Sequence, residues 1–104
     1  MDMKQMMRQA QKMQKQLNEA QEEIAGMSFE ASAGGGMVKA VVSGNLSLAS
    51  LEIDKEAVDP EDVEMLQDMV VAAVNEALRG MNELSEARLS AVTGGMNIPG
   101  MPGF

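Results

Sequence analysis

The spacing of apolar residues in the first 27 positions predicts one long helix. Steps of three and four residues alternate, which places these side chains in a single stripe along the helix, called here the apolar seam: Met3, Met6, Ala10, Met13, Leu17, Ala20, Ile24 and Met27. Two positions in seven make a narrow stripe, and this width favours contact with another helix over packing on a sheet. Gly26 suits the end of the helix.

After Gly26 the pattern changes to a period of two, which predicts three strands. Residues 27–33 alternate apolar and polar side chains, and residues 37–43 are rich in β-branched side chains. Three glycines at 34–36 predict the first turn, and Gly44-Asn45 indicates a two-residue hairpin turn. With a third strand at 46–53, we expect a three-stranded antiparallel meander.

The third strand has an irregular apolar pattern. Leu46 and Leu48 share one parity, whereas Leu51 and Ile53 share the other. Because successive side chains of a strand point to opposite faces, all four can lie inside only if a bulge near Ala49-Ser50 shifts the alternation.

A second long helix is predicted from Asp59 to about Leu89 or Val92. Asp59 can cap it, and Pro60 suits its first helical position. Its apolar stripe is wider than the first helix's seam, so it is the better candidate for the core and dimer helix. The order helix, three strands, helix predicts an α+β fold with a single domain at 1–92. Gly- and Pro-rich residues 93–104 predict a flexible tail.

Composition narrows the possible functions. The 104 residues include no Cys and no His, which excludes disulfides, zinc–thiolate sites and the usual nucleophile–imidazole pairs. We therefore expect a non-enzyme without cofactor or small-molecule substrate. With only two aromatic residues the core is small, and a partner subunit is expected to supply further burial. No apolar stretch is long enough to span a bilayer, so we expect a soluble, cytoplasmic protein.

Half of the eight cationic residues lie on one side of the first helix. This cationic stripe falls within an arc of about 80° opposite the apolar seam and spans about 16 Å: Lys4, Arg8, Lys12 and Lys15. Only Glu19 is spaced to neutralise one of them, Lys15. The stripe is either a solvated surface or a contact surface for a row of phosphates. With so few aromatics, duplex phosphates are a better target than stacked single-stranded bases.

The region from 52 to 68 has the opposite charge. It contains eight carboxylates and only Lys55, but it has neither the glycine nor the ligand spacing of a calcium loop. We therefore predict no metal site, and we expect this region to repel nucleic acid. The glycines at 34–36 precede no Gly-Lys-Ser or Gly-Lys-Thr sequence and no helix, so they are not a phosphate loop.

Four blocks in a fixed order carry a family resemblance: MRQAQKM at 7–13, AGGGMVK at 33–39, MLQDMVVAAVNEA at 65–77 and TGGMNIPG at 93–100. In these blocks the chain resembles the YbaB/EbfC family of bacterial nucleoid-associated proteins. The resemblance implies a tweezer-like homodimer with the sheets and second helices at the centre and the first helices projecting. It also implies duplex DNA binding in the nucleoid, in nucleoid organisation or gene regulation, without catalysis.

By position, the resemblance assigns DNA contacts to Lys4, Arg8, Lys12 and Lys15, with Arg79 and Arg88 of the second helix as further candidates. The third strand has no basic residue and the net charge is −8, so we expect weak and salt-sensitive DNA binding. The main alternative is a protein-interaction module, in which the Met-rich first helix pairs with a partner's helix and the cations only maintain solubility.

Overall fold

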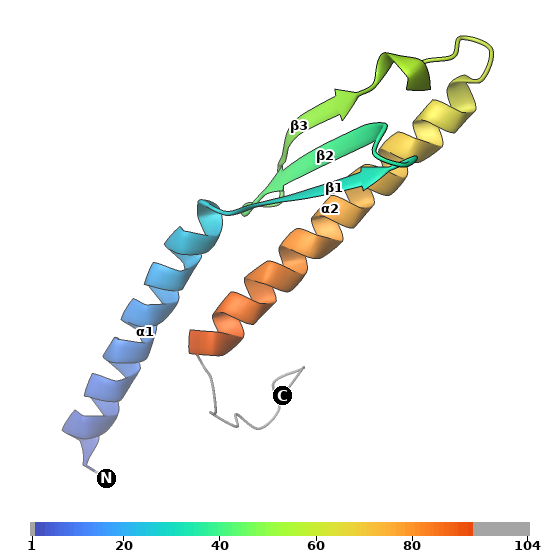
Figure 1. The fold of residues 1–104 in the computed structure, drawn as a ribbon. Helices are drawn as coiled ribbons and strands as arrows, with labels where there is room; N and C mark the ends of the chain where they lie inside the picture. Colours follow the sequence, from blue (N-terminus) through green and yellow to red (C-terminus); the bar gives the residue numbers. More distant parts are fainter. Residues whose placement is uncertain (1, 93–104) are drawn as a thin grey trace.

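The computed structural model describes residues 2–92 (Figure 1). The elements are α1 (Met3–Ala25), β1 (Ser28–Ala33), β2 (Val38–Ser43), β3 (Leu48–Ile53), the short 3-10 helix η1 (Lys55–Ala57) and α2 (Val63–Val92). This order confirms the predicted α+β fold. The segment 93–104, predicted to be a flexible tail, lies outside the described residues.

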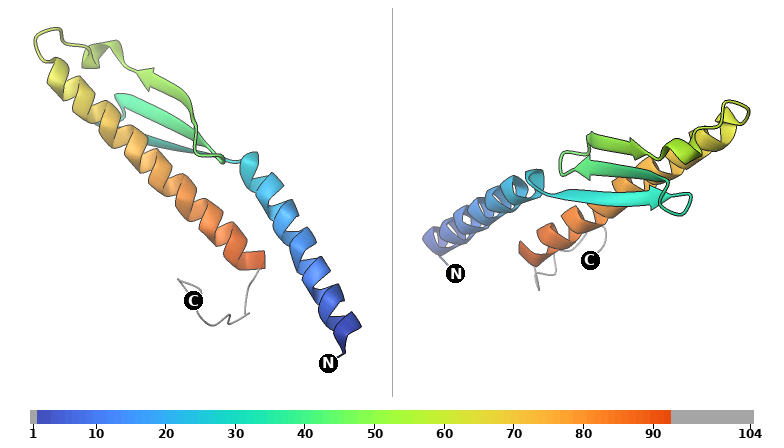
Figure 2. Two further views of the ribbon diagram at one scale, coloured as in Figure 1. Left: turned by 180° about the vertical axis from the view of Figure 1, so that it is seen from behind. Right: turned by 45° about the horizontal axis from the view of Figure 1, so that its top comes forward.

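The sheet is an antiparallel meander with strand order β1-β2-β3. Helix α2 packs mainly against β1 and β2 and continues beyond the sheet, where it lies beside α1 (Figure 2). The molecule measures 71 × 25 × 15 Å and has a radius of gyration of 19.6 Å. A compact chain of this length has a radius of gyration of about 13 Å. The fold is therefore strongly elongated, and much of its apolar surface is not covered by other residues within 2–92.

The core lies between β2 and the middle of α2. Val38, Ala40 and Val42 alternate along β2 and are fully buried, as are Ala73, Ala77 and Met81 on one side of α2. Small alanines allow the helix to lie close to the strand. Phe29 of β1 packs over Gly80, where an added Cβ would lie 2.2 Å from the ring.

The two turns differ from each other. Gly34, Gly35 and Gly36 all have φ between +64° and +95°, a region that glycine enters without steric cost. The predicted turn at Gly44-Asn45 is confirmed, because the Leu46 N–H donates to the Ser43 carbonyl at 2.9 Å across these two residues. The predicted two-residue loop is wrong, because four residues, 44–47, separate β2 from β3. Ser43 N–H donates to the Ser47 carbonyl at 2.8 Å, and Leu46 has φ +62°.

Gly44 also contacts the end of α1. Its N–H donates to the Met27 carbonyl at 2.9 Å, and a Cβ on Gly44 would lie 1.6 Å from the Ile24 carbonyl oxygen. Gly44 is thus held against the end of α1 at a place where no Cβ fits, and it is also part of the reversal. This contact between distant parts of the chain requires glycine here, and the local sequence does not reveal it.

The predicted bulge in the third strand is confirmed. Val41 pairs with Ser50 and Val42 with Leu48, so the register skips Ala49. Leu48, Leu51 and Ile53, called here the β3 ledge, therefore share the face of Val42, Ala40 and Val38. The bulge thus brings three of the four apolar residues to one face but does not bury them, and it does not include Leu46. The three ledge side chains are 48%, 38% and 40% exposed because β3 extends past α2, and Leu46 lies in the loop at 47%.

The predicted start of the second helix is also wrong. Asp59 accepts a hydrogen bond from the Glu61 N–H at 2.9 Å, and Pro60 lies in a turn closed by the Asp62 N–H to the Asp59 carbonyl. Asp62 then caps α2 by accepting from the Met65 N–H at 3.2 Å. The fixed φ angle of Pro60 suits both a turn and the first position of a helix, so the sequence alone does not distinguish them. In the structure Pro60 forms the turn, because the chain reverses direction after η1.

Candidate nucleic-acid interface

Helix α1 begins with a well-formed cap. The Asp2 carboxylate accepts a hydrogen bond from the Gln5 N–H at 2.8 Å, a cap that the sequence analysis did not identify. This cap stabilises the first turn of α1. All four residues of the cationic stripe are exposed to solvent: Lys4, Arg8, Lys12 and Lys15.

None of the ion pairs within residues 2–92 involves the cationic stripe. Lys15 forms no ion pair with Glu19, although their spacing would permit one. The four charges are therefore available to an external anion, and their separation along the helix axis is set by the helix geometry.

The apolar seam is buried over only part of its length. Ala20 is completely buried and Ile24 is 6% exposed, because α2 lies against this end of α1. Towards the N-terminus, Met6 is 56% exposed and Met3 is 79% exposed. The part of α1 that carries the cationic stripe thus projects from the body of the molecule, as both views show (Figure 2).

Arg79 and Arg88 lie on α2 and have carboxylate partners. Arg79 donates to Glu76 through Nε at 3.0 Å and through Nη2, and its Nη1 lies 2.5 Å from Glu83 Oε1. The hydrogen bond from Arg79 lowers the pKa of Glu76, and the two carboxylates raise the pKa of Arg79. The Arg88 Nε donates to Glu23, which links α2 to α1.

Charge is segregated along the molecule. Residues 2–18 carry four cations and one carboxylate, a net charge of +3, whereas residues 52–68 carry eight carboxylates and one lysine, a net charge of −7. These segments lie at opposite ends of the 71 Å axis (Figure 1). An anionic polymer is therefore attracted to one end and repelled from the other.

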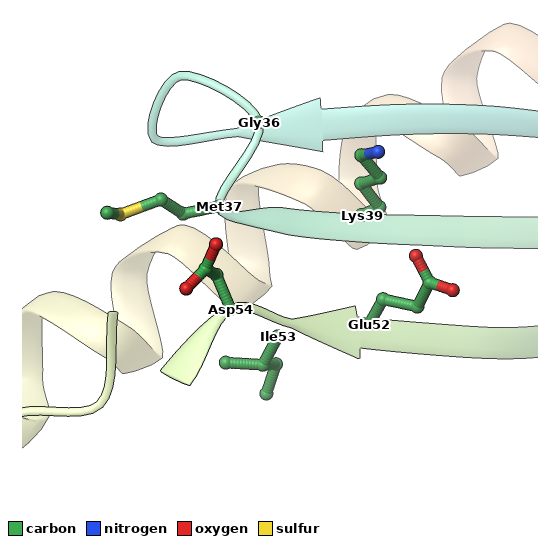
Figure 3. Close-up of a pocket in the computed structure, with 6 residues that line it drawn as sticks. All are labelled: Gly36, Met37, Lys39, Glu52, Ile53 and Asp54. Carbon is green, nitrogen blue, oxygen red and sulfur yellow. The ribbon is translucent and has the colours of Figure 1, made fainter. Parts of the chain in front are cut away.

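A shallow hollow of about 380 Å³ lies near the first turn (Figure 3). Lys39 and Glu52 are register partners on β2 and β3, and Asp54 lies beyond the end of β3. With two carboxylates against one lysine, this hollow is unsuited to a phosphate. Within residues 2–92 no three carboxylates are grouped so that they could hold a metal ion.

Sequence comparison then identifies the family. A model of the YbaB/EbfC DNA-binding family matches residues 1–96. The chain belongs to this family. A nucleoid-associated protein of Alkaliphilus metalliredigens is 53% identical over 100 residues, covering 96% of this chain and 88% of that protein. One from Nocardia farcinica is 47% identical over 103 residues, covering 99% and 94%.

The fold of this YbaB/EbfC member is also found in a solved structure. The crystal structure of an uncharacterized protein from Helicobacter pylori matches with a TM-score of 0.76 and 26% identity, covering 90% of this chain and 99% of that one. As for membranes, neither helix in the described part of the chain combines the length and apolar character needed to cross a bilayer.

Two surfaces of this family member escaped the sequence analysis. One is the β3 ledge, which the parity pattern placed inside. The other is a groove between α1 and the end of α2 that includes Met13 and Val92. Its residues are about 80 positions apart in sequence, so no local signal predicts it.

Proposed function

We propose that two copies of this chain pair through their sheets and second helices, and that the pair binds duplex DNA through the two cationic stripes. One observation carries the proposal: four cations on one side of a projecting helix have no carboxylate partner among residues 2–92. Unpaired cations in a row match the phosphates of a duplex, which attract them whatever the base sequence.

The β3 ledge supports the pairing of two copies. Leu48, Leu51 and Ile53 form an apolar row on the face of the sheet that α2 covers elsewhere. On α2, Val71 is 58% exposed and lies on the side of the helix away from Gly80 and Phe29. A second copy that covered the β3 ledge would extend the core of this elongated chain.

The proposed DNA contact is mainly electrostatic. On α1 the stripe spans about 16 Å, and a DNA strand advances about 3.4 Å per phosphate along the axis, so all four cations can meet phosphates at once. We leave Arg79 and Arg88 out of the proposed interface, because freeing either guanidinium would break an existing ion pair. With no aromatic side chain in α1, we expect little discrimination between base sequences.

The family and the relatives' names support a role on the nucleoid. Relatives about 50% identical are called nucleoid-associated proteins, and the family is named for DNA binding. On this support we propose that the chain acts in the cytoplasm, on the nucleoid, as an architectural or regulatory DNA-binding protein without catalytic activity.

Two charge-reversed variants with equal net charge test the interface. Arg8→Glu with Lys12→Glu alters the stripe, and Lys39→Glu with Lys55→Glu alters cations elsewhere; each pair changes the net charge from −8 to −12. Binding to a labelled duplex is measured by fluorescence anisotropy across salt concentrations. We expect the stripe variant to lose about four phosphate contacts per dimer and to flatten the log–log salt slope by about 3 to 4. Equal losses in both variants would mean that net charge alone acts, and the stripe would not be the site.

The alternative, a protein-interaction module, draws on a different observation. Met3, Met6 and Met7 are 79%, 56% and 60% exposed, so apolar surface on α1 is available to a partner's helix. Such apolar binding persists as salt rises, whereas phosphate binding weakens steeply. The same titration therefore distinguishes the two functions.

A further inference from the structure

The cover over the apolar seam stops where α2 stops. Val92, the last described residue of α2, lies beside Gln16 of α1, and both line a small hollow with Arg88. Towards Met3 the seam loses this cover from residues 2–92, so its exposure rises in that direction. Met13 is half-buried, whereas Met6 and Met3 are exposed.

A groove of about 530 Å³ begins at this point. Its lining combines apolar and polar side chains of α1 with Val92 of α2: Met6, Gln9, Ala10, Lys12, Met13, Gln16 and Val92. The described part of the chain therefore ends at the groove. That position is the reason to ask whether residues after 92 occupy it.

We propose that residues 94–101 of the same chain dock in this groove in an extended conformation, with Met96 and Ile98 against the apolar seam. Residues 93–104 contain no charged side chain, which suits them to an apolar surface. Gly94-Gly95 permits a change of direction after the helix, and Pro99 opposes its continuation. In an extended segment Met96 and Ile98 share one face.

The geometry permits this docking. Four extended residues after Val92 reach about 13 Å, and the α1 positions from Met13 to Met6 extend over only about 10 Å. Met96 can therefore reach the far end of the groove. Because the segment is tethered at the groove, its effective concentration there is in the millimolar range, and two or three apolar contacts suffice to hold it. A separate partner helix would have to displace it.

Cross-linking tests the proposal cleanly because the natural chain has no cysteine. One variant combines Gln9→Cys with Asn97→Cys, and the matched control combines Gln11→Cys with Asn97→Cys. Gln9 lines the groove, whereas Gln11 is exposed about 160° away around α1, on the opposite side. A short bismaleimide is added to a mixture of ¹⁵N-labelled and unlabelled full-length protein, and mass spectrometry separates links within one chain from links between chains.

We expect intrachain linking at Gln9 to exceed that at Gln11 by about tenfold, and the preference to disappear when Met96→Asp and Ile98→Asp are added. Equal yields at the two positions would overturn the proposal. Mixed-isotope links at Gln9 would also overturn it, since the occupant would then be the segment of a second copy. Neither outcome depends on DNA binding, so the result stands apart from the proposed function.

Discussion

The substitution Gly80→Ala sets two physical effects against each other. Gly80 lies in the middle of α2, where alanine normally stabilises a helix by about 1 kcal/mol relative to glycine. At this position the new methyl group would lie 2.2, 2.4 and 2.5 Å from three ring carbons of Phe29. Carbon atoms pack at about 3.5 to 4.0 Å, so the ring must move by more than 1 Å.

The clash is expected to outweigh the gain in helix propensity. Inserting a methyl group into a packed contact costs about 1 to 3 kcal/mol, and the ring cannot move outward without losing its contact with α2. We therefore expect Gly80→Ala to lower the free energy of unfolding by up to about 2 kcal/mol in net terms. Asn82→Ala, at an exposed position two residues along α2, serves as the control, because it raises helix propensity without a clash.

Urea unfolding followed by circular dichroism measures the effect. The protein concentration must be the same for all variants, because the stability of an associating protein depends on it. Combining Gly80→Ala with Phe29→Leu should remove the clash and reveal a favourable coupling of about 1 kcal/mol or more. If Gly80→Ala alone stabilises the protein by the full propensity difference, the ring moves without cost and the argument for a tight β1–α2 contact is refuted.

Three further substitutions test other parts of the structure. Asp62→Ala should lower the free energy of unfolding by about 1 kcal/mol through loss of the α2 cap, whereas Asp59→Ala should cost less in the same urea experiment. Leu51→Asp places a charge on the β3 ledge and should weaken dimerisation at least tenfold in sedimentation equilibrium. Ser50→Asp, on the opposite face of β3, is the control and should leave dimerisation unchanged. Equal effects of the two variants would show that the ledge is not in the interface. Arg79→Gln should leave the anisotropy-measured DNA affinity within about twofold, since Glu76 and Glu83 already hold its guanidinium; a loss as large as that of a stripe residue would place Arg79 in the interface.

The sequence was a good guide to the elements and a poor one to their ends. Periods of 3.5 and 2 predicted α1 and the three strands, and the parity change in β3 predicted the bulge at Ala49. The wrong boundaries fall in the connections between elements. The β2–β3 loop continues through Leu46, which has φ +62°, and Pro60 lies in the reversal that follows η1.

In the candidate site, too, local features could be predicted from the sequence and distant contacts could not. The exposure of the cationic stripe follows from its position opposite the seam. The partners of Arg79, Glu76 and Glu83, are three and four residues away, so both ion pairs could be predicted from helical spacing. The partner of Arg88 is Glu23, 65 residues away, and only the packing of α2 on α1 brings them together. The exposure of β3 likewise depends on how far α2 extends beneath the sheet.

Charge segregation also changes what the net charge implies for DNA affinity. At an ionic strength of 0.15 M the screening length is about 8 Å, so the carboxylates of residues 52–68 are too distant along a 71 Å molecule to cancel the stripe. At 0.01 M the screening length is about 30 Å, so repulsion between that end and DNA bound at α1 is only partly screened. We therefore expect the log–log salt plot to flatten at the lowest salt, and Glu61→Gln with Glu64→Gln to restore its linearity. A plot that stays linear in the natural protein would show that the acidic end has no influence on the bound duplex.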